Sequence, residues 1–124
     1  MKLRIRGDSL RLRLSQGEVA SFAERGALEE ATVFGADAKL VYALAFGDAV
    51  GATLSGTRIE VTIPADTARA WAKNEEVGIE GSVSTVDGRT LKILVEKDFA
   101  CLKPRDEDES DNYPHPNQHT TGEC

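Results

Sequence analysis

Residues 2–14 have the sequence KLRIRGDSLRLRL, and this stretch decides the fold class. Apolar and charged residues alternate on both sides of Gly7-Asp8-Ser9, a combination that is typical of a tight turn. Strict alternation has the period of a half-buried β-strand. The stretch therefore predicts a hairpin with leucines facing a core and arginines facing outward.

A helix is predicted directly after this hairpin. Ser15 and Glu18 have the spacing of a capping box, and Gly26 stands where a helix C-terminal cap belongs. The apolar stripe of this helix consists of Val19, Phe22 and Ala23. Residues 28–34 are predicted to form a strand, a turn follows at 35–37, and alternation over 40–46 predicts the second strand of a hairpin.

The same order of elements is predicted again in the second half. Strands at 52–54 and 59–63 flank a Ser-Gly turn, a helix follows over 64–73, and strands at 77–83 and 91–95 flank Asp87-Gly88, a strong hairpin signal. Asp66 is the expected cap of this helix. Trp71 lies on its apolar stripe with Ala68 and Ala72, so we expect its side chain to be buried.

The predicted fold is therefore α+β, with mainly antiparallel strands and two helices. A hairpin-helix-hairpin unit at 2–46 returns at 52–96, and a duplicated unit would form a curved sheet or open barrel about a pseudo-two-fold axis. Short hairpins are common, so coincidence is the alternative explanation of the repeat.

The length of 124 residues fits one domain, which we assign to residues 1–102. Residues 103–124 hold two cations against six carboxylates, with three prolines, and predict an acidic disordered tail. No stretch approaches the roughly 18 apolar residues of a membrane helix, and the N-terminus has no signal-like apolar run. We expect a cytoplasmic protein with free thiols at Cys101 and Cys124 and no membrane partner.

One predicted surface is strongly basic, although the whole chain has a net charge of −6. Its cations would project from one face of the first hairpin and could bind phosphate or carboxylate groups; they are Lys2, Arg4, Arg6, Arg11 and Arg13. The alternative is an ordinary solvated sheet exterior, or ion pairs with cross-strand glutamates such as Glu60 on a neighbouring strand.

The tail suggests a second kind of site. Its spacing of a cysteine, two histidines and a final cysteine partly resembles that of zinc ligands; the residues are Cys101, His115, His119 and Cys124. A bound zinc or other divalent ion is the hypothesis, and a solvated tail with incidental histidines is the alternative, because isolated ligand spacings often match by chance.

Catalytic chemistry has little support in the sequence. Both histidines lie in the tail, so the predicted domain lacks the base of a Ser-His or Cys-His site. No glycine-rich phosphate loop occurs. Carboxylate chemistry in a sheet cavity stays open as a further possibility, and no catalytic residue is assigned.

The opening MKLRIRGDSLRLRL and the late block EKDFACL, followed by an acidic tail, resemble a family of small uncharacterised bacterial proteins that form a domain of unknown function. The resemblance implies a single domain of bacterial, cytosolic origin, and it transfers no activity.

The sequence therefore favours a noncatalytic binding or interaction module. Its arginine-rich hairpin face would take an anionic partner, such as an acidic protein segment or a phosphate-bearing ligand, and the acidic tail would compete for that face. The alternative is a metal-binding protein or metal-dependent enzyme that uses the tail ligands.

Overall fold

The computed structural model describes residues 1–99, which form eight strands and two helices with one short 3-10 turn. In chain order the elements are β1 (Lys2–Ile5), β2 (Ser9–Leu14), α1 (Gln16–Arg25), β3 (Ala27–Gly35), β4 (Ala38–Phe46), β5 (Gly51–Ser55), β6 (Arg58–Ile63), α2 (Ala65–Lys73), β7 (Gly78–Ser84), η1 (Val86–Gly88) and β8 (Thr90–Lys97). The α+β class with mainly antiparallel strands and two helices is confirmed.

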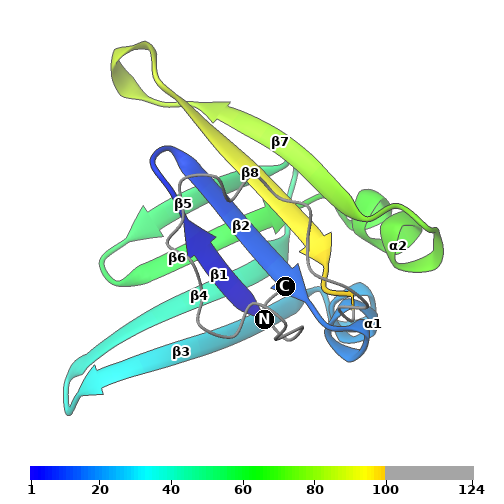
Figure 1. Ribbon diagram of the computed structural model, residues 1–124, viewed down its shortest axis with the longest axis horizontal. Coiled ribbons are helices and arrows are strands. Elements are labelled where there is room, and N and C mark those ends of the chain that lie inside the picture. The colour runs from blue at the N-terminus through cyan, green and yellow to red at the C-terminus, as the bar shows by residue number, and fades with distance from the viewer. Residues whose placement is uncertain (100–124) are drawn as a thin grey trace, which may run out of the picture.

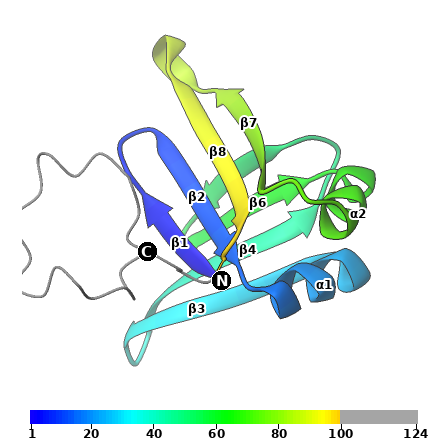
Figure 2. The same cartoon turned by 45° about the vertical axis from the view of Figure 1, so that its right-hand side comes forward.

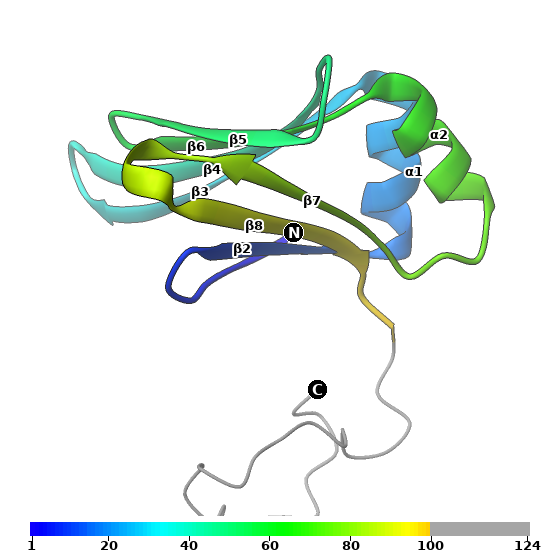
Figure 3. The same ribbon diagram turned by 90° about the horizontal axis from the view of Figure 1, so that it is seen from above.

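The strands divide into two four-stranded sheets, in the orders β1-β2-β8-β7 and β3-β4-β6-β5. The sheets lie as two layers, and both helices stand at one end of them (Figures 1 and 3). Within each sheet the outer pairs are antiparallel hairpins, whereas the central pairs β2–β8 and β4–β6 are parallel. Each sheet thus joins one hairpin from each half of the chain, and neither half forms a sheet by itself.

The two halves pair in equivalent registers. Leu12 on β2 faces Val95 on β8, and Val61 on β6 faces Leu44 on β4. Leu12 and Val61 differ by 49 in number and Leu44 and Val95 by 51, and the other central pairs follow the same two offsets. The halves are therefore related by a pseudo-two-fold arrangement of their pairings. An origin of this arrangement by duplication of one sequence stays a prediction.

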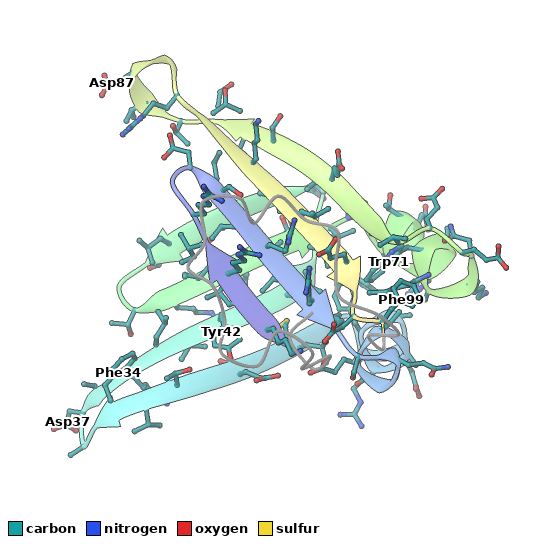
Figure 4. All side chains as sticks on the ribbon, viewed as in Figure 1. Phe34, Asp37, Tyr42, Trp71, Asp87 and Phe99 are labelled. Atoms are coloured by element: carbon teal, nitrogen blue, oxygen red, sulfur yellow. The ribbon has the colours of Figure 1, made fainter. Side chains whose placement is uncertain are left out.

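The core lies between the two sheets and continues under the helices. The buried residues of β2, β6 and β8 occupy alternate positions, as expected for strands with one inward face. β4 differs, because its consecutive residues Ala43 and Leu44 are both buried. Phe22 on α1 and Trp71 on α2 have at most 1% of their surface exposed, as the sequence predicted. Both rings belong to the same hydrophobic cluster as the buried strand residues, so they join the helices to the sandwich. Figure 4 labels Trp71 at this end of the molecule.

The helix ends follow the sequence only in part. Ser15 and Glu18 form the predicted capping box, and Gly26 ends α1 at a φ of 80°, in the left-handed region that favours glycine. The prediction for Asp66 is wrong: α2 is capped at Pro64 without a side-chain hydrogen bond, and Asp66 lies in its first turn. There a carboxylate still interacts favourably with the helix dipole.

The α-amino group of Met1 connects three elements. It donates to the carboxylates of Glu18 on α1 and Glu30 on β3, and the hydroxyl of Tyr42 on β4 donates to Glu30 at 3.3 Å. Burial lowers the pKa of this amine, but the two carboxylates outweigh burial and leave its pKa above the ordinary value of 8.0. The offsets of 49 and 51 map Met1 onto Val50 and Glu30 onto Gly81, and at that equivalent place Val50 packs onto Gly81.

No helix within residues 1–99 is long and apolar enough to cross a membrane.

Candidate anion-binding face

The outward face of the β1-β2-β8-β7 sheet gathers the basic side chains. Pairing sets Lys2 opposite Arg13, which faces Glu96 on β8, and sets Arg4 opposite Arg11, which faces Leu94. The inward neighbours Leu10, Leu12 and Leu14 are buried, so the alternate positions face solvent. Four of the five predicted cations therefore share one strand-paired surface, which we call the basic face: Lys2, Arg4, Arg11 and Arg13, joined by Lys92 of β8.

One carboxylate serves two of these arginines. Glu96 Oε1 lies 2.9 Å from Arg13 Nε and 3.3 Å from Arg11 Nε. Lys2 forms a separate ion pair with Asp98, at 2.8 Å. The two guanidinium groups share one negative charge, so the centre of the basic face keeps a net positive charge.

Arg4 and Lys92 form no ion pair within the described part of the chain, and both are exposed. Arg6 is also exposed and has no ion pair there, but it lies in the turn between β1 and β2, beyond the paired strand residues. Within residues 1–99 the structure thus separates the predicted set into three cations that form ion pairs, Lys2, Arg11 and Arg13, and two that form none, Arg4 and Arg6.

The expected ion pairing with Glu60 is wrong. Glu60 belongs to β6 in the other sheet, where it accepts a hydrogen bond from Arg58 at 3.3 Å. The carboxylate that does neutralise the arginines, Glu96, comes from the far end of the sequence. Its role depends on the parallel β2–β8 pairing, which the local alternation of either strand does not reveal.

Two shallow hollows lie on this side of the sheet. The smaller, of about 270 Å³, lies among Lys2, Leu3, Arg4, Arg11 and Arg13. The larger, of about 540 Å³, lies over β2, β8 and β7, with Ser9, Glu80, Ser82, Lys92 and Leu94 among its lining residues. Figure 2 shows these four strands side by side, with β1 and β7 at the two edges.

The other sheet provides an internal comparison. The offset of 49 maps Arg4 onto Thr53 and Arg11 onto Glu60, and these two residues are also directly paired. On that sheet's face Arg58 lies between Glu29, at 2.5 Å, and Glu60. Equivalent positions of one architecture therefore carry one cation between two carboxylates on one sheet and an excess of cations on the other.

The concentration of arginines opposes folding to some degree. Like charges directly opposite in antiparallel strands destabilise a sheet, and both Lys2–Arg13 and Arg4–Arg11 are such pairs. A solvated exterior has no need of two like-charged pairs in succession. An anion on this face would relieve both.

The metal hypothesis lies outside the described residues, since Cys101, His115, His119 and Cys124 all follow residue 99. Within residues 1–99 no three histidine, cysteine, aspartate or glutamate side chains lie close enough to hold a metal ion. The larger hollow contains one carboxylate, Glu80, among its lining residues, which provides no paired carboxylates for general acid and base catalysis.

Comparison with known proteins gives one result. Neither the curated proteins nor the solved structures include a match to this chain. A family model matches residues 1–117, so the chain belongs to a family of unknown function, DUF7009.

Proposed function

We propose that this protein is a noncatalytic binding module whose basic face takes an anionic ligand or partner. The observation that carries the proposal is the succession of like-charged pairs, Lys2–Arg13 and Arg4–Arg11. The described residues that line the hollow beside them include no carboxylate, and Arg11 and Arg13 share the one carboxylate of Glu96. Guanidinium groups bind planar carboxylate and phosphate groups with two parallel hydrogen bonds. Arg4 has its donors free of any ion pair within residues 1–99.

The composition of the sheet limits the ligand class. β1, β2, β7 and β8 contain no aromatic residue. Single-stranded nucleic acids are usually held by stacking bases on aromatic side chains, and this face offers no such platform. Recognition would therefore depend on anionic groups alone, those of an acidic protein segment or of a phosphate-bearing ligand.

The acidic tail is the proposed modulator. Residues 103–124 have four more carboxylates than cations and are tethered to the domain that carries the basic face. A short flexible tether holds its end at an effective concentration on the order of millimolar. Individual surface ion pairs contribute about 0–1 kcal/mol, so competition by the tail would be weak and sensitive to salt. The proposed setting is the bacterial cytosol, where Cys101 and Cys124 would stay reduced.

The test measures binding of two probes, inorganic polyphosphate and poly-glutamate, to the full chain and to residues 1–102 across a salt titration. We expect the shorter chain to bind more tightly at low salt, and the two forms to converge as salt rises. The stronger of the two probes identifies the ligand class.

The variants are Arg4→Glu with Arg11→Glu, and the control is Lys39→Glu. Lys39 is an exposed cation on the other sheet and faces Val33, so its reversal changes the net charge without touching the basic face. The double variant should lose about tenfold or more in affinity, which corresponds to about 1.4 kcal/mol. The double variant changes the net charge by −4 and the control by −2. A loss of binding free energy in the control that is half that of the double variant, or more, would therefore reduce the effect to net charge. No binding by any form would leave the face an ordinary solvated exterior.

A further inference from the structure

The β3–β4 hairpin projects beyond the rest of its sheet. β3 has nine residues and pairs with β4 along its length, but the parallel pairing of β4 with β6 begins only at Val41, opposite Ala31. Figures 1 and 4 show the tip of this hairpin extending away from the rest of the molecule, and Figure 4 labels Phe34 and Asp37 there. Residues 32–35 therefore pair with the part of β4 that has no strand on its other side.

This segment is an unpaired and apolar strand edge. β3 is the outer strand of its sheet, and Val33 and Phe34 are 71% and 73% exposed. Proteins usually protect such edges with lysine, proline, short length or a covering element. Two other outer strands have such protection. β1 is only four residues long and carries Lys2 and Arg4, and β7 is covered by its contact with β5, where Val50 packs onto Gly81. The outer half of β3 has neither charge nor cover from the described residues.

The hydrogen-bonding groups that face outward can be identified. The N–H group of Phe46 donates to the C=O group of Gly26 at 3.0 Å. Gly26 precedes Ala27, which pairs with Ala45, so this bond continues the register of β3 and β4. In an antiparallel ladder the bonded pairs alternate, so the even-numbered residues from Leu28 bond to β4. The N–H and C=O groups of Glu29, Ala31 and Val33 then point to the open edge.

We infer that β3 pairs with β3 of a second copy of this chain, in antiparallel orientation and centred on Ala31. In this register Ala31 faces itself, and Glu29 of each copy faces Val33 of the other. The register brings no two carboxylates opposite each other, and it places the outward groups of residues 29, 31 and 33 in bonding positions. The two β3-β4-β6-β5 sheets would become one continuous eight-stranded sheet.

A second copy fits this edge better than an unrelated peptide would. The segment matches itself in length and hydrogen-bonding phase. The register also places Glu29 of one copy next to Val33 of the other, whose neighbour on β4 is the cation Lys39. The pairing also buries Val33, which otherwise remains exposed in the domain. Because the interface is a single strand edge, the dimer should be weak, with dissociation in the micromolar range or above.

Cysteine cross-linking tests the register. Ala31→Cys is introduced into the full chain that also carries Cys101→Ser and Cys124→Ser. Opposed residues of a bonded antiparallel pair lie about 5.5 Å apart between Cα atoms, within disulfide range. The matched control is Ser82→Cys, because the offset of 51 places Ser82 at the same position on β7, also an outer strand.

We expect rapid disulfide dimers from the Ala31→Cys chain under mild oxidation and at least about tenfold slower dimers from the Ser82→Cys chain. Equal rates would mean random collision and would overturn the inference.

Sedimentation velocity on the unmodified full chain gives an independent measurement. The weight-average mass should rise toward the dimer with concentration, Val33→Lys should abolish the rise, and Ser84→Lys, its equivalent on β7, should leave it unchanged. A monomer at all concentrations up to about 500 μM, or a dimer that persists in Val33→Lys, would refute the β3 pairing. Circular dichroism melts of each variant check that the domain stays folded.

Discussion

Replacing Arg4 by threonine should make the protein more stable and a poorer ligand binder. Arg4 lies directly opposite Arg11 and forms no ion pair within the described chain. Its removal therefore relieves a like-charge contact and breaks no favourable one. Threonine is the residue at the equivalent position of the other sheet, Thr53, which shows that this backbone site accommodates it.

The expected gain is small and has two contributions. A cross-strand pair of like charges costs about 0.2–1 kcal/mol, and threonine has a better intrinsic preference for strands than arginine, on a scale that spans about 1 kcal/mol. We therefore expect Arg4→Thr to raise the free energy of unfolding by about 0.5–1 kcal/mol at low salt. Arg11→Thr should gain less, because Arg11 also contacts Glu96 at 3.3 Å.

Urea unfolding at two salt concentrations separates these contributions. At 1 M salt the screening length falls to about 3 Å, so the electrostatic part of the gain should disappear and the strand preference should remain. Lys39→Thr is the control, because it makes the same kind of exchange opposite Val33, an uncharged residue. Its effect should not depend on salt.

A loss of stability above about 0.5 kcal/mol in Arg4→Thr, or a gain as independent of salt as that of the control, would refute the view that the basic face is electrostatically strained. The linked expectation is that polyphosphate or poly-glutamate raises the melting temperature of the unmodified chain more than that of Arg4→Thr, since a ligand stabilises only the state that binds it.

Three further predictions address the core, the N-terminus and the tail. Trp71→Ala should cost about 3–5 kcal/mol in denaturant melts, because the ring is 1% exposed; a loss below about 1 kcal/mol would contradict its core position. The raised pKa of the Met1 amine contributes stability that is present below pH 8.0 and is lost as the pH rises through the raised pKa. Burial opposes the lowered pKa of Glu18, but the Met1 amine sustains it, and the resulting stability is lost as the pH falls below 4.5. Glu18→Gln should weaken this loss of stability in acid, and an unchanged pH profile would argue against the pairing of Met1 with Glu18. If the tail holds a metal, the purified full chain should contain near-stoichiometric zinc by elemental analysis, and chelation should lower its melting temperature; a metal-free protein that zinc does not stabilise would remove the hypothesis.

Local sequence patterns predicted the elements and the four hairpins, but not the parallel pairs that join the hairpins into sheets. Alternation identified β2, β4, β6 and β8, and the capping box with its later glycine bounded α1, because these signals depend on contacts a few residues apart. The parallel pairing of β2 with β8 joins residues more than eighty positions apart. Two apolar strands of this kind could pair with many others, so local patterns do not select among them.

The candidate site shows the same division. Alternation correctly placed Lys2, Arg4, Arg11 and Arg13 on one outward face. It could not identify Glu96 as their shared carboxylate or Lys92 as a further cation, since both come from β8. The pseudo-two-fold register would have provided this signal, because it specifies which hairpin of one half pairs with which hairpin of the other.

The comparison between the two sheets limits what the basic face can be. Both outward faces are built on the same registers, so their backbone geometry imposes the same demands on solubility and strand formation. The face with Thr53 and Glu60 meets those demands with one cation, Arg58, paired to two carboxylates. Solvation alone therefore does not require two successive like-charged pairs on the other face. The excess of cations there needs a cause that only one sheet has, and a ligand of opposite charge on that sheet is such a cause.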